Sequence, residues 1–164
     1  MSYSPVEQVN HRLYCCRLQL DYYQSLLHEQ KLPVAVIESM AGESLIYLLQ
    51  RAFQAYLNEL SLSLNNGECW NQGLEGLVDT LAAEGAESSN ITELLTLMEA
   101  PDSWLSVLTQ KLDVAQEKPV VSMAGDIPLR RVEQPSMLSE KPLVTAFQGL
   151  SELIERQRLT SQEW

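Results

Sequence analysis

The chain has 164 residues, of which 45% are hydrophobic and 20% are charged, and its net charge is −11. These values are typical of about one globular domain with its own core, and they exclude an intrinsically disordered chain. The negative charge argues against binding to nucleic acids or to anionic membrane surfaces. It is concentrated in residues 52–110, which hold nine acidic residues and no Lys or Arg, whereas the segments on either side each sum to −1. We interpret this acidic segment as a solvated surface, and the alternative is a surface that attracts a basic partner.

The cysteines indicate a reducing compartment. Cys15, Cys16 and Cys69 are odd in number and lack the spacing of metal-binding or redox motifs. The first residues contain no basic and apolar signal region, and no apolar run reaches the about 18 residues that a membrane span needs. We therefore expect a cytoplasmic protein without a membrane partner.

The first predicted helix covers residues 5–31. Pro5 suits its first turn, and Pro33 ends the element. Apolar residues spaced alternately three and four apart mark its buried face: Val6, Val9, Leu13, Cys16, Leu20, Tyr23 and Leu27. Three heptads are too few for a long coiled coil, so the pattern favours a helical hairpin or bundle.

The second predicted helix covers residues 33–64 and carries two apolar stripes. They consist of Ile37, Ala41, Leu45, Leu48, Ala52 and Ala55, and of Ile46, Leu49, Phe53, Tyr56, Leu57 and Leu60. A helix that is apolar on two sides is normally central, so we expect Leu48 and Phe53 in the core and Glu59 on the surface.

The remaining predicted elements are shorter. Asn65-Asn66-Gly67 breaks the central helix, Asn90 with Glu93 resembles a capping box, and prolines keep residues 118–138 extended. Further helices are predicted at residues 70–84, 90–99, 101–117 and 140–158. The sequence thus predicts a single all-α domain, residues 1–164, in which a helical bundle surrounds a long central helix and an extended, proline-containing strap precedes the last helix.

The strap supplies the predicted binding residues, Arg130 and Arg131, which are the only adjacent basic pair. They would dock on the acidic segment or contact a partner, and the alternative is a solvated turn. Trp70 and Trp104 are each followed after four positions by a leucine, which indicates core or rim residues rather than a ligand cage.

Glu7, His11 and Cys15 form the most catalytic-looking pattern, because spacing of four places an acid, an imidazole and a thiol on one helix stripe. No glycine-rich turn or strand end accompanies them to form an oxyanion site. Only His11 and His28 could serve as imidazole ligands, and neither the Glu-x-x-His nor the Cys-x-x-Cys spacing occurs. Phosphate-loop, dinucleotide and kinase motifs are also missing. The sequence therefore predicts no catalytic residue, no cofactor and no metal.

Four segments are similar to a small bacterial family of uncharacterised proteins from gamma-proteobacteria: residues 9–14 (VNHRLY), 43–49 (ESLIYLL), 98–104 (MEAPDSW) and 127–129 (IPL). These are packing motifs, and the resemblance implies a fold and a compartment but no activity. The central helix also resembles HEPN-type helical bundles, whose active members carry an Arg followed after four to six residues by a His. Here Arg17 precedes His28 by eleven positions. This second resemblance therefore implies at most a bundle without the ribonuclease motif.

Two function classes follow from the sequence. A bundle without converging polar residues has no evident catalytic site and can interact with other molecules only through its surfaces. This favours a non-enzymatic module that binds a protein partner or forms a homo-oligomer. The alternative is an enzyme or small-ligand binder, such as a diverged HEPN-like bundle, whose pocket forms from residues distant in sequence.

Overall fold

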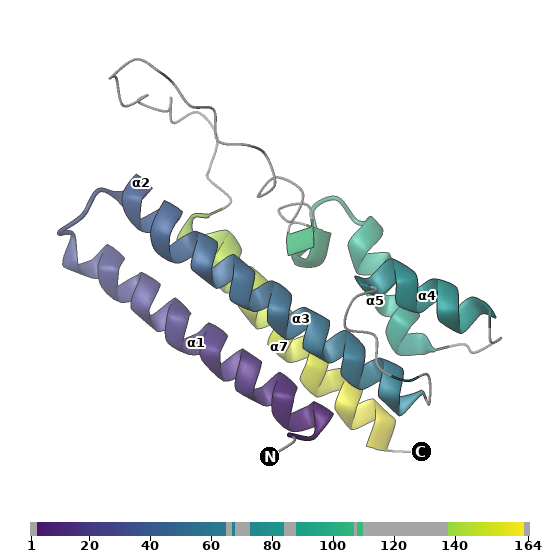
Figure 1. Ribbon diagram of the computed structural model, residues 1–164. Helices are drawn as coiled ribbons and strands as arrows, with labels where there is room; N and C mark the ends of the chain where they lie inside the picture. Colours follow the sequence, from purple (N-terminus) through teal and green to yellow (C-terminus); the bar gives the residue numbers. More distant parts are fainter. Residues whose placement is uncertain are drawn as a thin grey trace, which may run out of the picture.

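A computed structural model describes residues 3–64, 67, 73–83, 88–106, 108–109 and 138–162. Within these ranges the secondary structure is helical, without strands, which confirms the all-α class. Three long helices, α1, α3 and α7, lie side by side, and the shorter α4 and α5 lie on the side of the bundle away from α1 (Figure 1). The predicted strap, except Leu138, lies outside the described residues, as do Arg130, Arg131 and most of the predicted helix 101–117.

Helix α1 spans Pro5–Glu29 and begins with a complete capping box. The backbone N–H of Ser4 donates to Glu7 Oε2 at 2.8 Å, and the backbone N–H of Glu7 donates to Ser4 Oγ at 3.3 Å. Gln30 ends the helix in the left-handed conformation, with φ of 52°. Four of the seven members of the predicted apolar face are buried: Val9, Cys16, Leu20 and Tyr23. Leu13 and Leu27 are partly buried against the core, whereas Val6 in the first turn is 44% exposed, so its predicted burial is wrong.

The central helix is continuous from Val34 to Ser63 but is not α-helical throughout. It consists of α2 (Val34–Ile37), a π-helical turn η1 (Glu38–Gly42) and α3 (Glu43–Ser63). It packs against α1, α4 and α7, which confirms its central place. Both predicted stripes are largely buried, although Leu48 is only half-buried while its neighbour Leu49 is fully buried.

One residue of the central helix was placed wrongly from the sequence. Glu59, expected on the surface, has a side chain only 12% exposed and forms an ion pair with Arg158 of α7, whose side chain is 22% exposed. The reason is that α7 runs beside α3 and brings a basic partner from far along the chain. Glu59 is therefore a structural residue.

Helices α4 (Gly73–Ala83) and α5 (Ser89–Glu99) precede a short helical segment that includes Trp104. The predicted cap of α5 is wrong: the N-cap is Ser88, so Asn90 lies inside the helix. There its backbone carbonyl accepts a hydrogen bond from Gln157 Nε2 at 3.2 Å. Contact with α7, rather than local capping, holds this end of α5.

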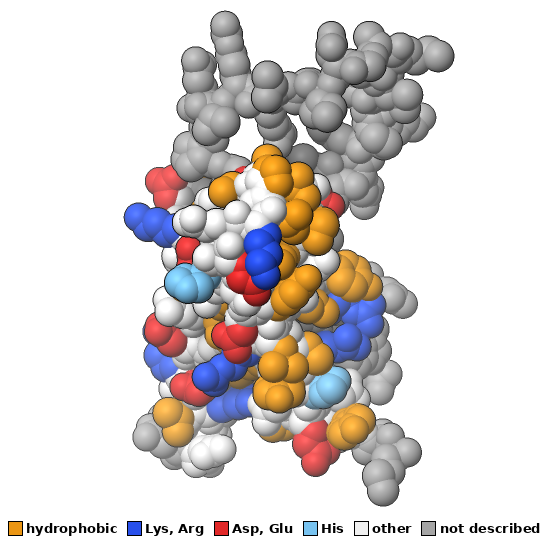
Figure 2. Space-filling model, turned by 90° about the vertical axis from the view of Figure 1, so that its left-hand side faces the viewer, with side chains coloured by type: hydrophobic (Ala, Val, Ile, Leu, Met, Phe, Trp, Pro, Cys, Tyr) orange, Lys and Arg blue, Asp and Glu red, His pale blue; other side chains and the backbone are white. Residues whose placement is uncertain are grey.

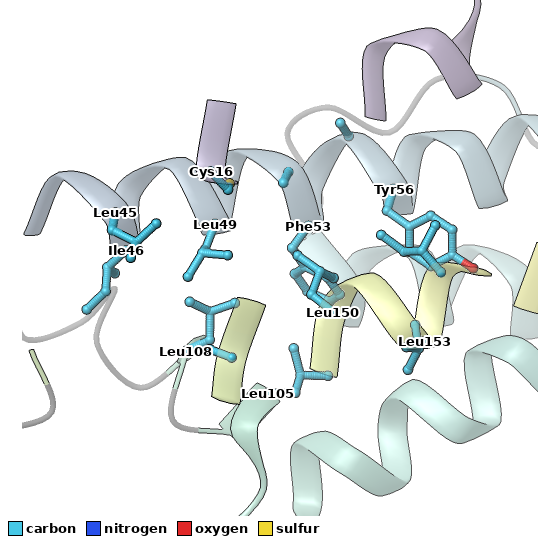
Figure 3. Packing of buried hydrophobic residues seen from close by; sticks show 14 of the residues in the cluster. Cys16, Leu45, Ile46, Leu49, Phe53, Tyr56, Leu105, Leu108, Leu150 and Leu153 are labelled. Carbon is cyan, nitrogen blue, oxygen red and sulfur yellow. The ribbon is translucent and has the colours of Figure 1, made fainter. Parts of the chain in front are cut away.

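Helix α7 spans Glu140–Gln162 and completes the core. Leu49 and Phe53 of α3 point toward Leu150 of α7 and toward Leu105 and Leu108, which follow α5 (Figure 3). Just before α7 the chain passes close to the central helix. A Cβ added to Gly42 would lie only 3.0 Å from the carbonyl oxygen of Leu138. Tyr23 of α1 fixes the same carbonyl with a hydrogen bond of 2.8 Å.

Candidate functional site

Exposed hydrophobic side chains are concentrated at one part of the molecule. Ten of the eleven large ones in the described part of the chain lie between Tyr3 and Tyr47, on α1, the following turn and the beginning of the central helix, and the eleventh is Leu159. The ten are Tyr3, Val6, Tyr14, Leu18, Tyr22, Leu32, Val34, Val36, Met40 and Tyr47. Figure 2 views the molecule from the side of α1 and α2 and shows hydrophobic side chains along this face, interspersed with charged ones. We call these ten residues the hairpin surface.

The centre of the hairpin surface is a stripe on α1 formed by Tyr14, Leu18 and Tyr22, which we call the outer stripe. Their exposed fractions are 59%, 51% and 51%. Because an α-helix turns about 100° per residue, Leu18 and the buried Leu20 point to nearly opposite sides of α1. Helix α1 therefore has a second apolar face, which no described element covers.

Exposed residues of the central helix extend this surface. Val36, Met40 and Tyr47 lie on the helix that packs against α1. Gln19 of α1 connects the two helices, because its Nε2 donates a hydrogen bond of 3.3 Å to the carbonyl oxygen of Ala41. Arg51 lies over the Tyr47 ring, 5.8 Å from its centroid. The hairpin surface thus spans two helices.

The catalytic-looking stripe is only partly assembled. His11 Nε2 lies 3.8 Å from Cys15 Sγ, and the ring of Tyr3 stacks on His11 with centroids 6.3 Å apart. Glu7, however, is bound in the helix cap, and its hydrogen bonds with Ser4 lower the pKa of its carboxyl group. Glu7 therefore caps α1 and does not orient His11.

The two neighbouring cysteines differ in environment. Cys16 is completely buried, and this burial raises the pKa of its thiol to about 12. Cys15 is half-buried on the flank of α1. Cys16 is therefore a core residue, and Cys15 is the thiol that reagents reach more readily.

An open groove of about 750 Å³ lies between α5 and α7. Trp104, Gly149 and Leu153 line it together with Leu97 and the exposed Leu159. A Cβ added to Gly149 would come within 2.6 Å of the Trp104 indole, so the indole packs directly on the α7 backbone. This contact agrees with a rim position for Trp104. Gly149 could have been singled out from the sequence only as a glycine inside a predicted helix, which often marks a close approach.

The groove has an acidic rim. Glu93, Glu152 and Glu155 contribute to its lining, and the single basic lining residue, Arg156, pairs with Glu93. Gln157 Nε2 also donates to Glu93 Oε2 at 2.9 Å. Behind the groove, the Tyr56 hydroxyl donates to Gln157 Oε1 at 2.5 Å, and burial raises the pKa of Tyr56.

The described ranges contain no group of three or more His, Cys, Asp or Glu side chains that could hold a metal ion. In the same part of the chain, no helix combines the length and the apolar character needed to cross a membrane. Arg130 and Arg131, the predicted binding residues, lie outside the ranges described, so their role stays a prediction.

Comparison with known proteins identifies the family. Residues 1–164, the whole chain, match a family of unknown function, DUF6586. The protein belongs to DUF6586. No curated protein matches the chain, and neither does any solved structure. Membership in DUF6586 confirms the resemblance to an uncharacterised family and assigns no chemistry.

Proposed function

We propose that the protein is a non-enzymatic interaction module that uses the hairpin surface to bind a protein chain. The observation that carries this proposal is that ten of the eleven exposed large hydrophobic side chains in the described part of the chain lie on this surface. Single exposed hydrophobic residues are normal in globular proteins, but several on one helix face, such as the outer stripe, point to an interaction site. The outer stripe also has the spacing of four that helix pairs use when they pack.

Energetics indicate that the whole hairpin surface takes part. Burying a side chain such as leucine completely is worth about 1.5–3 kcal/mol, so each half-exposed residue of the outer stripe adds roughly 1 kcal/mol. Association costs several kcal/mol in lost freedom of motion, and a stable interface takes about 20–30 residues from each partner. The three residues of the outer stripe are too few for an interface of this size. Val36, Met40 and Tyr47 on the neighbouring helix enlarge the apolar surface and bring it closer to that size.

The groove between α5 and α7 supports a second candidate function, binding of a small ligand. The groove is open to solvent, and Trp104 provides a flat apolar wall. The three carboxylates of its rim, of which one is paired with Arg156, favour a cationic ligand. An enzyme of the alternative class would use the same groove.

Photo-crosslinking in the native cell tests the main proposal and separates it from the alternative. A benzophenone amino acid replaces Leu18 in the outer stripe, Gln148 in the groove, or Lys141, an exposed polar position on α7 that serves as the matched control. We expect a discrete protein adduct from position 18 and none from position 141. No adduct from position 18, or equal labelling at both positions, would contradict the proposal. An adduct from position 148 alone would favour the groove.

A further inference from the structure

We infer that the occupant of the hairpin surface is a second copy of the same chain, with the two α1 helices antiparallel and crossing at Leu18. The inference rests on the proposed function, because it names the partner of the same surface. The outer stripe is symmetric about its middle residue, since Tyr14 and Tyr22 each lie four positions from Leu18. In an antiparallel pair centred on Leu18, Tyr14 of each copy lies opposite Tyr22 of the other.

The charges beside the outer stripe fit the same symmetry. Arg17 and Asp21 are both exposed, and neither forms a hydrogen bond or an ion pair with another described residue. An α-helix rises about 1.5 Å per residue, so an axis through Leu18 sets Arg17 only about 3 Å along the helix from Asp21 of the second copy. The twofold axis repeats this pair, so the dimer contains two contacts between Arg17 of one copy and Asp21 of the other. A parallel arrangement would instead set like charges at the same height, which is unfavourable.

The distribution of charge over the chain also selects this surface for self-association. Each copy carries a net charge of −11, and contact between acidic surfaces would repel. Residues 1–51, however, sum to only −1, whereas residues 52–110 sum to −9. Helices α4 and α5, which belong to the acidic segment, lie away from α1 with α3 and α7 between (Figure 1). Contact through α1 therefore keeps the acidic segments of two copies apart, and salt screens charges beyond about 8 Å.

Sedimentation equilibrium of the purified full chain, from about 1 µM to about 1 mM, tests the inference. We expect a reversible dimer whose dissociation constant rises at least about tenfold in Leu18→Glu, because this change places a charge in the centre of the contact. Leu18 is exposed, so circular dichroism should show an unchanged fold. Lys141→Glu, an exposed change of charge on α7, is the matched control and should leave the dimer intact.

Two charge reversals then test the antiparallel pairing. Arg17→Asp and Asp21→Arg should each weaken the homodimer, because each creates like charges at both contacts. An equimolar mixture of the two variants should associate more strongly than either alone, since every contact in the mixed dimer again joins opposite charges. The double variant R17D/D21R should also regain association. A mixture no stronger than its components would overturn the antiparallel arrangement.

The outcomes separate this inference from the proposed function. A chain that stays monomeric at the highest concentration, or a dimer of unchanged strength in Leu18→Glu, overturns self-association through the outer stripe. If position 18 nevertheless crosslinks in the cell to a protein of different mass, the interaction module stands with another partner. An adduct of twice the chain mass supports the second copy, and no adduct removes both.

Discussion

Arg158 and Glu59 form an ion pair with two hydrogen bonds: Nε of Arg158 lies 2.8 Å from Oε1 of Glu59, and Nη2 lies 2.6 Å from Oε2. The third guanidinium nitrogen, Nη1, donates to Asn10 Oδ1 at 2.8 Å. One side chain thereby connects α7 with α3 and with α1. The arrangement is bidentate and largely shielded from solvent, and the hydrogen bonds raise the pKa of Arg158, so the guanidinium stays charged.

Removing this pair should destabilise the bundle. Arg158→Ala leaves the carboxylate of Glu59 largely buried without its partner, and we expect it to lower the free energy of unfolding by about 1–3 kcal/mol in urea titrations. Arg156→Ala is the matched control, because the Arg156–Glu93 pair is exposed and should contribute less than about 1 kcal/mol. Equal losses in the two variants would mean that the Glu59 pair does not connect the helices.

Two adjacent leucines test the position of the core. Leu49→Ala should cost about 2–5 kcal/mol, since a fully buried side chain leaves a cavity when it is truncated. Leu48→Ala should cost clearly less, because Leu48 is only half-buried at the edge of the core. Urea unfolding followed by circular dichroism measures both, and a larger loss in Leu48→Ala would contradict the deeper burial of Leu49.

The thiols should differ in reactivity. In the native protein, iodoacetamide should alkylate Cys15 faster than Cys16, because Cys16 is buried and its thiol remains protonated until about pH 12. Peptide mapping by mass spectrometry distinguishes the two sites. Both should react at similar rates in concentrated urea, and equal rates without urea would show that Cys16 is not a core residue.

The raised pKa of Cys16 also predicts alkaline destabilisation. The unfolded thiol ionises near its ordinary value of 9.0 and the folded thiol near 12, so the folded state holds its proton longer. This contribution to stability is complete below about pH 9 and is lost as the pH rises toward 12. In Cys16→Ala, the free energy of unfolding should therefore fall less steeply between pH 9 and pH 10 than in the native chain. Equal slopes of the free energy of unfolding against pH in the two proteins would contradict the raised pKa of Cys16.

Gly149 and Trp104 form a pair for a double-mutant cycle. Gly149→Ala should destabilise the native chain by about 1–3 kcal/mol, because the new methyl group displaces the indole. In a Trp104→Ala background the same change should be neutral or stabilising by up to about 1 kcal/mol, since alanine favours a helix. An equal loss of stability in both backgrounds would show that the effect of Gly149→Ala does not come from contact with Trp104.

The buried face of α1 was predictable from the sequence because it depends on local periodicity: Val9, Cys16, Leu20 and Tyr23 follow one stripe. The partner of Glu59 was not, because Arg158 lies 99 residues away and only the packing of α7 brings them together. The candidate surface is an intermediate case. The outer stripe has an equally regular spacing, but periodicity does not show which of two apolar faces the rest of the protein covers.

The π-helical turn η1 gives the length of the central helix a structural meaning of its own. A π turn accommodates one residue more than an α turn, and each residue of an α-helix accounts for a rotation of about 100°. The extra residue is therefore absorbed within this turn, and α2 keeps the facing relative to α3 that an uninterrupted α-helix with one residue fewer would give it. Loss of one residue within Glu38–Gly42 should turn this segment into ordinary α-helix while Ile37 stays in the core and Val36 stays exposed. Loss of one residue from an α-helical part of the central helix would instead turn the preceding residues by more than a quarter of a revolution and change which side chains the protein presents to a partner.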